Sequence, residues 1–162
     1  MEGYIKDCIK DNKGEPISLL DIDTENNPTK IEQFSMWSLN NVKRFIGSEV
    51  HCYSENLWIG GIIDCIAELK DGTKAIIDFK SSKESYSNHF IQLGGYDIQL
   101  SENGGFTSNG ETIIEPIKID SYIIIPFGAD KFKIDIRTNL NDYIDAFCNA
   151  LELYKLLEIK KI

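Results

Sequence analysis

The chain has 162 residues, 42% of them hydrophobic, which is typical of one soluble globular domain with a single core. Its formal net charge of −9 at pH 7 opposes long-range attraction to nucleic acid, so DNA binding would require a metal ion together with a local basic strip. No apolar run approaches membrane-spanning length, and the first residues lack the basic and apolar regions of a signal peptide, so we expect a cytoplasmic protein that does not contact a membrane.

The first half of the chain predicts an irregular start, one helix and three consecutive strands. Residues 1–30 are polar and poorly periodic, so we expect an irregular N-terminal segment. The run Asn-Asn-Pro-Thr at 26–29 indicates a turn and a helix N-cap, and apolar residues at approximate helical spacing predict a helix over 31–46. The predicted strands that follow are 48–54, 57–69 and 74–80.

The second half predicts two helices and two strands. Residues 88–100 form the first helix, in which Gly94-Gly95 costs stability and would let another backbone or a substrate approach closely. Residues 101–111 predict a Gly/Asn/Ser loop or the turn of a wide hairpin. A buried strand, a half-exposed strand and a last helix are then predicted over 121–126, 131–137 and 139–157.

The cysteines argue against a zinc site. They are widely scattered and form no Cys-x-x-Cys pair, at positions Cys8, Cys52, Cys65 and Cys148. We therefore expect reduced thiols, as in a cytosolic protein.

Two carboxylates and a lysine are predicted to meet on neighbouring strands. The Asp-Gly pair at 71–72 is a strong hairpin signal, and folding back at this turn brings Asp64 near Asp78. The strand period puts Asp78 and Lys80 on one face of their strand. A slip of one residue would move a carboxylate to the opposite face, so the pairing itself is an inference.

These residue types suit metal-assisted hydrolysis of a phosphodiester. Mg²⁺ usually takes one or two protein carboxylates, a role that Asp64 and Asp78 fit. Lys80 is suited to holding or activating the attacking water, or to neutralising charge on the phosphate in the transition state. The competing interpretation is structural: Asp64 as a solvent-facing strand end, and Asp78 with Lys80 as an ion pair of little energetic weight.

The segment 45–127 carries further motif elements in a set order: Glu49, Gly61-x-x-Asp64, Asp78-x-Lys80-Ser81 and Gln92-x-x-x-Tyr96. In this order they resemble the core of the PD-(D/E)XK nuclease superfamily, in its RecB-like and phage exonuclease branch. The resemblance implies an α/β fold with a restriction-endonuclease-like core, in which a mixed central sheet is flanked by helices, over a single domain of residues 1–162.

The resemblance also implies an activity. It suggests a deoxyribonuclease dependent on Mg²⁺ or Mn²⁺, acting as an exonuclease in phage or mobile-element DNA recombination, repair or processing, inside a bacterial or phage-infected host cell. It assigns metal binding to Glu49, Asp64, Asp78 and the backbone carbonyl of Phe79. It assigns catalysis to Asp64, Asp78, Lys80, Gln92 and Tyr96. The partners that it implies are DNA and a recombination or single-strand-annealing protein, and a homo-oligomer is compatible with it.

Two departures from the family pattern keep alternatives open. Many members of the branch carry a metal-binding His on an N-terminal helix, whereas the predicted helix 31–46 has none, so Glu32 or Gln33 would have to substitute. The N-terminal region is also short. A catalytically inactive nuclease-fold protein that binds DNA or protein is therefore the alternative function, and an unrelated α/β domain is a third. The competing interpretation for Glu49 is an exposed strand residue, and for Gln92 and Tyr96 it is the polar face of a helix, with no role in metal binding or catalysis.

Overall fold

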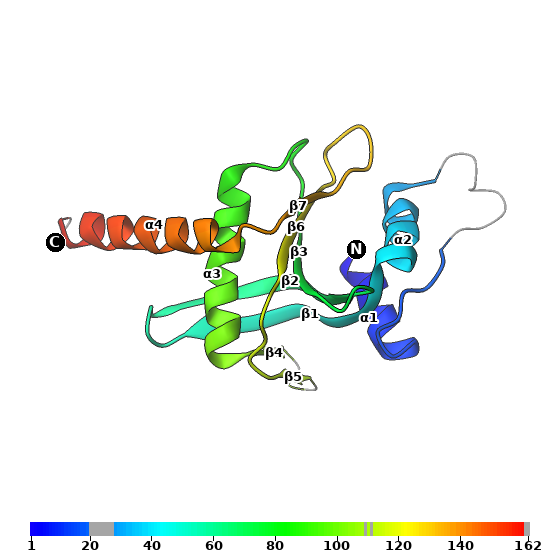
Figure 1. The fold of residues 1–162 in the computed structure, drawn as a ribbon, viewed down its shortest axis with the longest axis horizontal. Coiled ribbons are helices and arrows are strands. Elements are labelled where there is room, and N and C mark those ends of the chain that lie inside the picture. The colour runs from blue at the N-terminus through cyan, green and yellow to red at the C-terminus, as the bar shows by residue number, and fades with distance from the viewer. Residues whose placement is uncertain (20–27, 109, 111, 161–162) are drawn as a thin grey trace.

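The computed structural model describes residues 1–19, 28–108, 110 and 112–160. Over these residues it is an α/β fold with one seven-stranded mixed sheet flanked by four helices (Figure 1). The elements in chain order are α1 (Glu2–Asp11), α2 (Lys30–Asn41), β1 (Val42–Ser54), β2 (Ile59–Leu69), β3 (Lys74–Lys80), α3 (Ser87–Asn103), β4 (Gly105–Thr107), β5 (Ile113–Ile114), β6 (Ser121–Pro126), β7 (Asp135–Arg137) and α4 (Leu140–Lys160). The expected α/β class with a mixed, helix-flanked sheet is confirmed at this level.

The sheet combines an antiparallel meander with one parallel crossover. Its strand order is β5-β4-β1-β2-β3-β6-β7, with β1, β2 and β3 pairing antiparallel in sequence. β3 then pairs parallel with β6 through the crossover helix α3, and β7 pairs antiparallel with β6. This topology puts the end of β3, which carries the candidate lysine, beside the start of the connection to α3.

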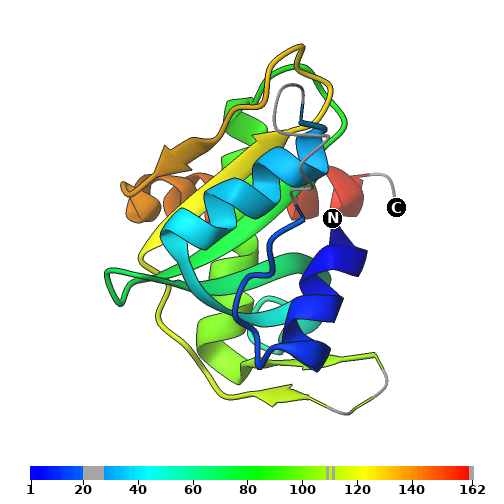
Figure 2. The same ribbon diagram turned by 90° about the vertical axis from the view of Figure 1, so that its right-hand side faces the viewer.

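Helices cover both faces of the sheet. α1 and α2 lie on one face and α3 lies on the other, with α4 packed on α3 (Figures 1 and 2). β3 is buried on both faces, because Ala75 and Ile77 pack in the cluster with α1 and α2, whereas Ile76 packs in the cluster with α3. Asp78 and Lys80 therefore lie on a strand that is covered on both faces.

The N-terminal segment differs from the expected irregular start. Residues 2–11 form α1, which buries Tyr4, Ile5 and Cys8 against the sheet. These residues are one and three positions apart and therefore lie on one face of the helix. Their burial stabilises the helix, although the polar residues between and around them make the helical pattern weak in the sequence. Residues 20–27 of the predicted irregular segment lie outside the described residues.

The helix predicted over 31–46 is shorter in the structure. Its N-cap is confirmed, because the Thr29 side chain accepts from the backbone of Glu32 in a capping box. The helix ends at Asn41, however, and the chain continues directly as β1, in which Phe45 pairs with Ala67 of β2. Pairing with a neighbouring strand overrides the apolar spacing that continued the helical pattern.

The remaining elements follow the predictions with local changes. The strand predicted over 131–137 is limited to β7, and residues 101–111 include β4, which forms a hairpin with β5. Gly94-Gly95 was expected to let either another backbone or a substrate approach closely. The structure shows another backbone, because a Cβ on Gly94 would lie 2.7 Å from the Tyr143 carbonyl oxygen of α4. In the part of the chain that is described, no helix is long and apolar enough to cross a membrane.

Candidate functional site

The two candidate carboxylates lie where the β2–β3 ladder ends. The last registered pair is Cys65 with Ile77, so Asp64 and Asp78 occupy the next positions along the two strands. Beyond this pair a side chain takes the place of a backbone hydrogen-bond acceptor: Asp64 Oδ2 accepts the backbone N–H of Phe79 at 2.9 Å. The predicted proximity of the two carboxylates therefore appears in the structure, held by a hydrogen bond that the sequence pattern does not reveal.

The carboxyl group of Asp64 is in an unfavourable environment for negative charge. Burial raises the pKa of Asp64 from 3.8 to about 6. The Phe79 N–H lowers this pKa, the neighbouring Asp78 carboxylate raises it, and Lys80 lowers it slightly. Adjacent carboxylates, one of them with a raised pKa, are frequent at functional sites and would be stabilised in their ionised form by a cation.

The carboxylate of Asp78 is buried and incompletely satisfied. Asp78 is only 4% exposed, and its Oδ2 lies 2.7 Å from Lys80 Nζ. The contact is a close ion pair without hydrogen-bond geometry, so among the described residues this oxygen has no hydrogen-bond partner. Its charge is balanced by Lys80, while its lone pairs stay available to another ligand.

Lys80 begins a chain of hydrogen bonds that crosses to α3. Its Nζ donates to Gln92 Oε1 at 2.7 Å, and Gln92 Nε2 donates to Tyr96 Oη at 2.9 Å. Gln92 and Tyr96 are one turn apart on α3, as their spacing of four predicts. Burial, and next the charge of Asp78, raise the pKa of the Tyr96 hydroxyl. The structure therefore brings Asp64, Asp78, Lys80, Gln92 and Tyr96 together.

Gly61 has a physical role in this arrangement. A Cβ at this position would lie 2.5 Å from Cε1 of the Tyr96 ring. The glycine of the Gly-x-x-Asp element therefore lets the aromatic ring lie against β2. Without a side chain at position 61, α3 can place Tyr96 and Gln92 next to the carboxylate strands.

Glu49 lies opposite Asp64 on β1, but its side chain is engaged elsewhere. The flanking register pairs are Ser48 with Cys65 and Val50 with Ile63, and Glu49 itself has a left-handed backbone with φ of 52°. Its carboxylate forms an ion pair with Lys6 of α1, which lowers the pKa of Glu49. Sequence reasoning missed Lys6, because its helix was not predicted.

The set of metal ligands expected from the resemblance is only partly assembled. Among the described residues, no group of three or more His, Cys, Asp or Glu side chains is placed to hold a metal ion. The Asp64–Asp78 pair thus stands without a third such side chain. Metal binding by Glu49 and by the Phe79 carbonyl stays a prediction.

The two residues considered as substitutes for the missing His both bond to the chain at the start of their own helix. The Glu32 carboxylate accepts the Thr29 backbone N–H at 2.6 Å, and Gln33 Nε2 donates to the Pro28 carbonyl at 2.9 Å. These contacts hold both side chains at the start of α2. The substitution of either residue for the missing His stays a prediction.

Comparisons with known proteins do not assign a family. No protein-family model matches the chain, and a search of curated proteins finds no match. The functional argument therefore rests on the motif elements and on the geometry described above.

Proposed function

We propose that this chain is a metal-dependent nuclease with a restriction-endonuclease-like core, which hydrolyses phosphodiester bonds in DNA as an exonuclease. The observation that carries the proposal is the Asp64–Asp78 pair at the open end of the β2–β3 ladder, with the Lys80 ammonium beside it. A structural ion pair accounts for Lys80 with Asp78, but it does not account for a second, half-buried carboxylate whose ionisation is disfavoured.

The two carboxylates fit Mg²⁺ or Mn²⁺. The buried Asp78 Oδ2 lacks a hydrogen-bond partner among the described residues, and Asp64 offers a second hard oxygen donor next to it. Mg²⁺ commonly takes one or two protein carboxylates and completes its coordination with water and substrate phosphate. When bound, such an ion supplies Lewis acidity and lowers the pKa of a coordinated water.

Lys80, Gln92 and Tyr96 would act on the substrate side of these carboxylates. Gln92 orients the Lys80 ammonium through a hydrogen bond of 2.7 Å, so the positive charge is held beside Asp78. An ammonium in this position neutralises charge that develops on the phosphate, or holds the attacking water. The Tyr96 hydroxyl, held by Gln92, is available to contact a phosphate oxygen.

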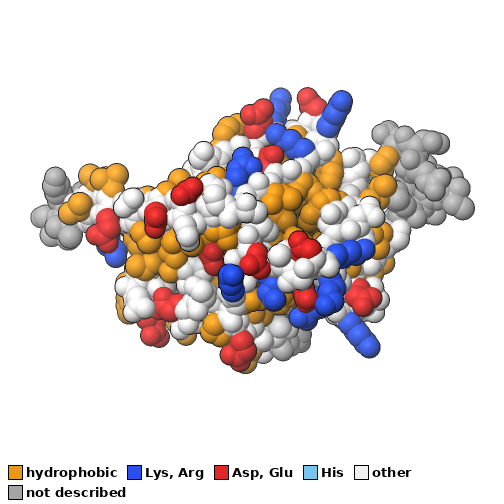
Figure 3. Space-filling model, in the orientation of Figure 1, with side chains coloured by type: hydrophobic (Ala, Val, Ile, Leu, Met, Phe, Trp, Pro, Cys, Tyr) orange, Lys and Arg blue, Asp and Glu red, His pale blue; other side chains and the backbone are white. Residues whose placement is uncertain are grey.

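Charge limits how such an enzyme would hold DNA. The net charge of −9 disfavours long-range attraction, although Lys and Arg side chains gather over the region of α1 on one face (Figure 3). Weak intrinsic affinity would be offset by a recombination or single-strand-annealing partner, or by a homo-oligomer that encloses DNA.

The test is a cleavage assay on end-labelled linear single- and double-stranded DNA and on closed circular DNA, with Mg²⁺, Mn²⁺ or EDTA. The wild type should degrade the linear substrates only with metal, and Asp78→Asn and Lys80→Ala should abolish this. Asp71→Asn, which changes an exposed carboxylate in the β2–β3 turn, is the matched control and should cleave normally. Cleavage of the circle would indicate an endonuclease, and no cleavage in any condition would refute the proposal.

The alternative is an inactive nuclease-fold protein that binds DNA or protein. It is favoured by the acidic charge and by the Lys80–Asp78 ion pair, which already balances one of the two carboxylates. Calorimetric titration with Mn²⁺ separates the two functions. A functional centre should bind Mn²⁺, with binding lost in Asp78→Asn, whereas an inactive one should bind it no better than that variant.

A further inference from the structure

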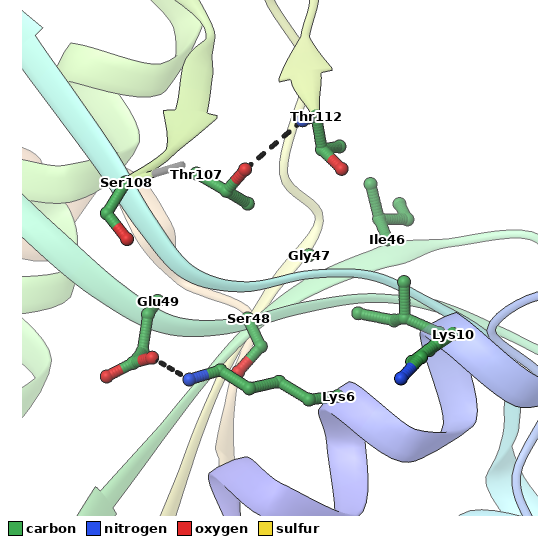
Figure 4. A pocket seen from close by; sticks show the side chains of 10 residues that line it. Lys6, Lys10, Ile46, Gly47, Ser48, Glu49, Thr107, Ser108 and Thr112 are labelled. Atoms are coloured by element: carbon green, nitrogen blue, oxygen red, sulfur yellow. Dashed lines mark hydrogen bonds and ion pairs between the residues drawn. The ribbon is translucent and has the colours of Figure 1, made fainter. Parts of the chain in front are cut away.

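A pocket of about 390 Å³ lies between α1, β1 and the chain around β4 and β5 (Figure 4). Its wall includes two lysines of α1, an apolar side and polar residues of β1: Lys6, Lys10, Ile9, Ile46, Ser48 and Glu49. The volume falls in the range of small-molecule sites, about 300–1,000 Å³. None of its residues belongs to the Asp64–Asp78–Lys80 cluster.

A buried hydroxyl in this pocket lacks a partner. Ser48 is 5% exposed, and among the described residues its Oγ has no hydrogen-bond partner. Figure 4 shows this hydroxyl directed toward the Lys6 side chain. An unsatisfied buried hydroxyl is costly and uncommon in folded proteins. Neighbouring side chains cover the Ser48 hydroxyl, so a ligand oxygen satisfies it once they move aside.

The charges of the pocket favour an anion. Lys6 and Lys10 are one turn apart on α1 and both line it. Glu49 also lines the pocket and pairs with Lys6, and Glu2 lies close to both of them, so Lys10 supplies the positive charge that is available to an anion. Figure 4 shows Lys6 extended toward Glu49, while Lys10 is drawn without a dashed contact. Lysine ammonium groups are common ligands of phosphate. Ile9 and Ile46 add an apolar wall suited to a sugar or base.

We propose that this pocket binds the phosphate of a nucleotide. Lys6 and Lys10 hold the phosphate, the Ser48 hydroxyl donates to one of its oxygens, and Ile9 and Ile46 pack against the sugar or base. The nucleotide is either free or the terminal unit of a DNA strand, since both present the same chemistry.

Occupation of the pocket has a consequence for Glu49. A phosphate that takes Lys6 removes the partner of the Glu49 carboxylate, and Glu49 lies opposite Asp64 in the β1–β2 register. Glu49 itself has a left-handed backbone, which costs energy in a non-glycine residue. The nucleotide should therefore raise metal affinity at the Asp64–Asp78 pair. This coupling rests on the proposed function, whereas nucleotide binding does not.

Calorimetric titration of the metal-free protein tests the binding site. The ligands are deoxyadenosine monophosphate, a short oligonucleotide with a terminal phosphate and the same oligonucleotide without it. Binding should depend on the phosphate and weaken about tenfold or more in Lys10→Ala, because the variant loses a charge-assisted hydrogen bond to the phosphate. Ser48→Ala should also weaken it, whereas the exposed-lysine control Lys131→Ala should not.

The outcomes separate the ligand sources and the two proposals. If the mononucleotide binds as tightly as the phosphorylated oligonucleotide, the site is assigned to a free nucleotide. If only the phosphorylated oligonucleotide binds, the site is assigned to the end of a DNA strand. Absence of phosphate-dependent binding, or binding unchanged in Lys10→Ala, overturns the pocket proposal even if the protein cleaves DNA. Mn²⁺ titration is then done with and without whichever phosphate ligand binds. The ligand should tighten Mn²⁺ binding in the wild type and leave it unchanged in Glu49→Gln. Equal Mn²⁺ affinities in the wild type with and without the ligand refute the coupling.

Discussion

Replacing Asp64 by asparagine should stabilise the metal-free protein at pH 8 but not at pH 4. Burial raises the pKa of Asp64 from 3.8 to about 6, so the folded state binds the Asp64 proton more tightly than the unfolded state. Stability from this group is fully present below pH 3.8 and is lost as the pH rises through 6. The substitution Asp64→Asn removes the ionisable group, so the variant does not lose this stability as the pH rises.

The expected gain follows from the size of the pKa shift. A shift from 3.8 to about 6 corresponds to about 3 kcal/mol, at about 1.4 kcal/mol per pH unit. Water at this half-buried carboxyl reduces the gain to about 1–2 kcal/mol, which raises the Tm of a chain of this size by about 2–8 °C. In the wild type Asp64 accepts the Phe79 N–H at 2.9 Å. The amide oxygen of asparagine should accept the same N–H, so we expect the variant to retain this hydrogen bond.

Thermal unfolding followed by circular dichroism in EDTA, at pH 4 and pH 8, measures this effect. The control is Glu68→Gln: Arg44 and Lys43 lower the pKa of Glu68, so removing its charge should reduce stability at pH 8. If Asp64→Asn lowers the Tm at pH 8, or raises it equally at both pH values, the ionised Asp64 is not destabilised and the electrostatic argument for the site fails.

Three further substitutions test other contacts. Gly61→Ala puts a Cβ 2.5 Å from the Tyr96 ring. It should lower the free energy of unfolding in urea by about 1–3 kcal/mol and reduce the rate of cleavage. Wild-type values for both would contradict the role of Gly61. Gly94→Ala puts a Cβ 2.7 Å from the backbone of α4, so the Tm should fall, and an unchanged Tm would refute the close helix contact. Tyr122→Phe removes the 2.5 Å hydrogen bond to the buried Asp97 carboxyl, whose pKa burial raises, and should cost about 1–3 kcal/mol at neutral pH. The cost should be smaller in acid, where Asp97 is protonated; equal costs at both pH values would argue against this account.

Local signals were sufficient to predict the centre of the sheet. The hairpin is confirmed: Gly72 has a φ of 87°, and the Asp71 side chain accepts the Thr73 N–H, as expected of an Asp-Gly turn. With the turn placed, the two-residue strand period brings Asp64 and Asp78 together and puts Lys80 on the face of Asp78. The spacing of four likewise predicted the Gln92–Tyr96 pair, because helical geometry depends only on neighbouring residues.

Local signals were misleading where distant contacts decide the conformation. The apolar pattern through Phe45 suits a helix, but pairing with Ala67 makes it a strand. α1 was not predicted, because a polar segment is held helical by three residues buried against a sheet formed later in the chain.

The sequence by itself determined the meander, its Asp-Gly turn and the approximate meeting of two carboxylates and a lysine, because turn chemistry and strand period act over a few residues. Only the tertiary structure decided how the polar groups are used. Asp64 accepts a backbone N–H across the strand end, and Glu49 pairs with Lys6, 43 residues away in sequence. Such contacts depend on side-chain direction at a left-handed residue and on the packing of α1, neither of which a periodic pattern encodes.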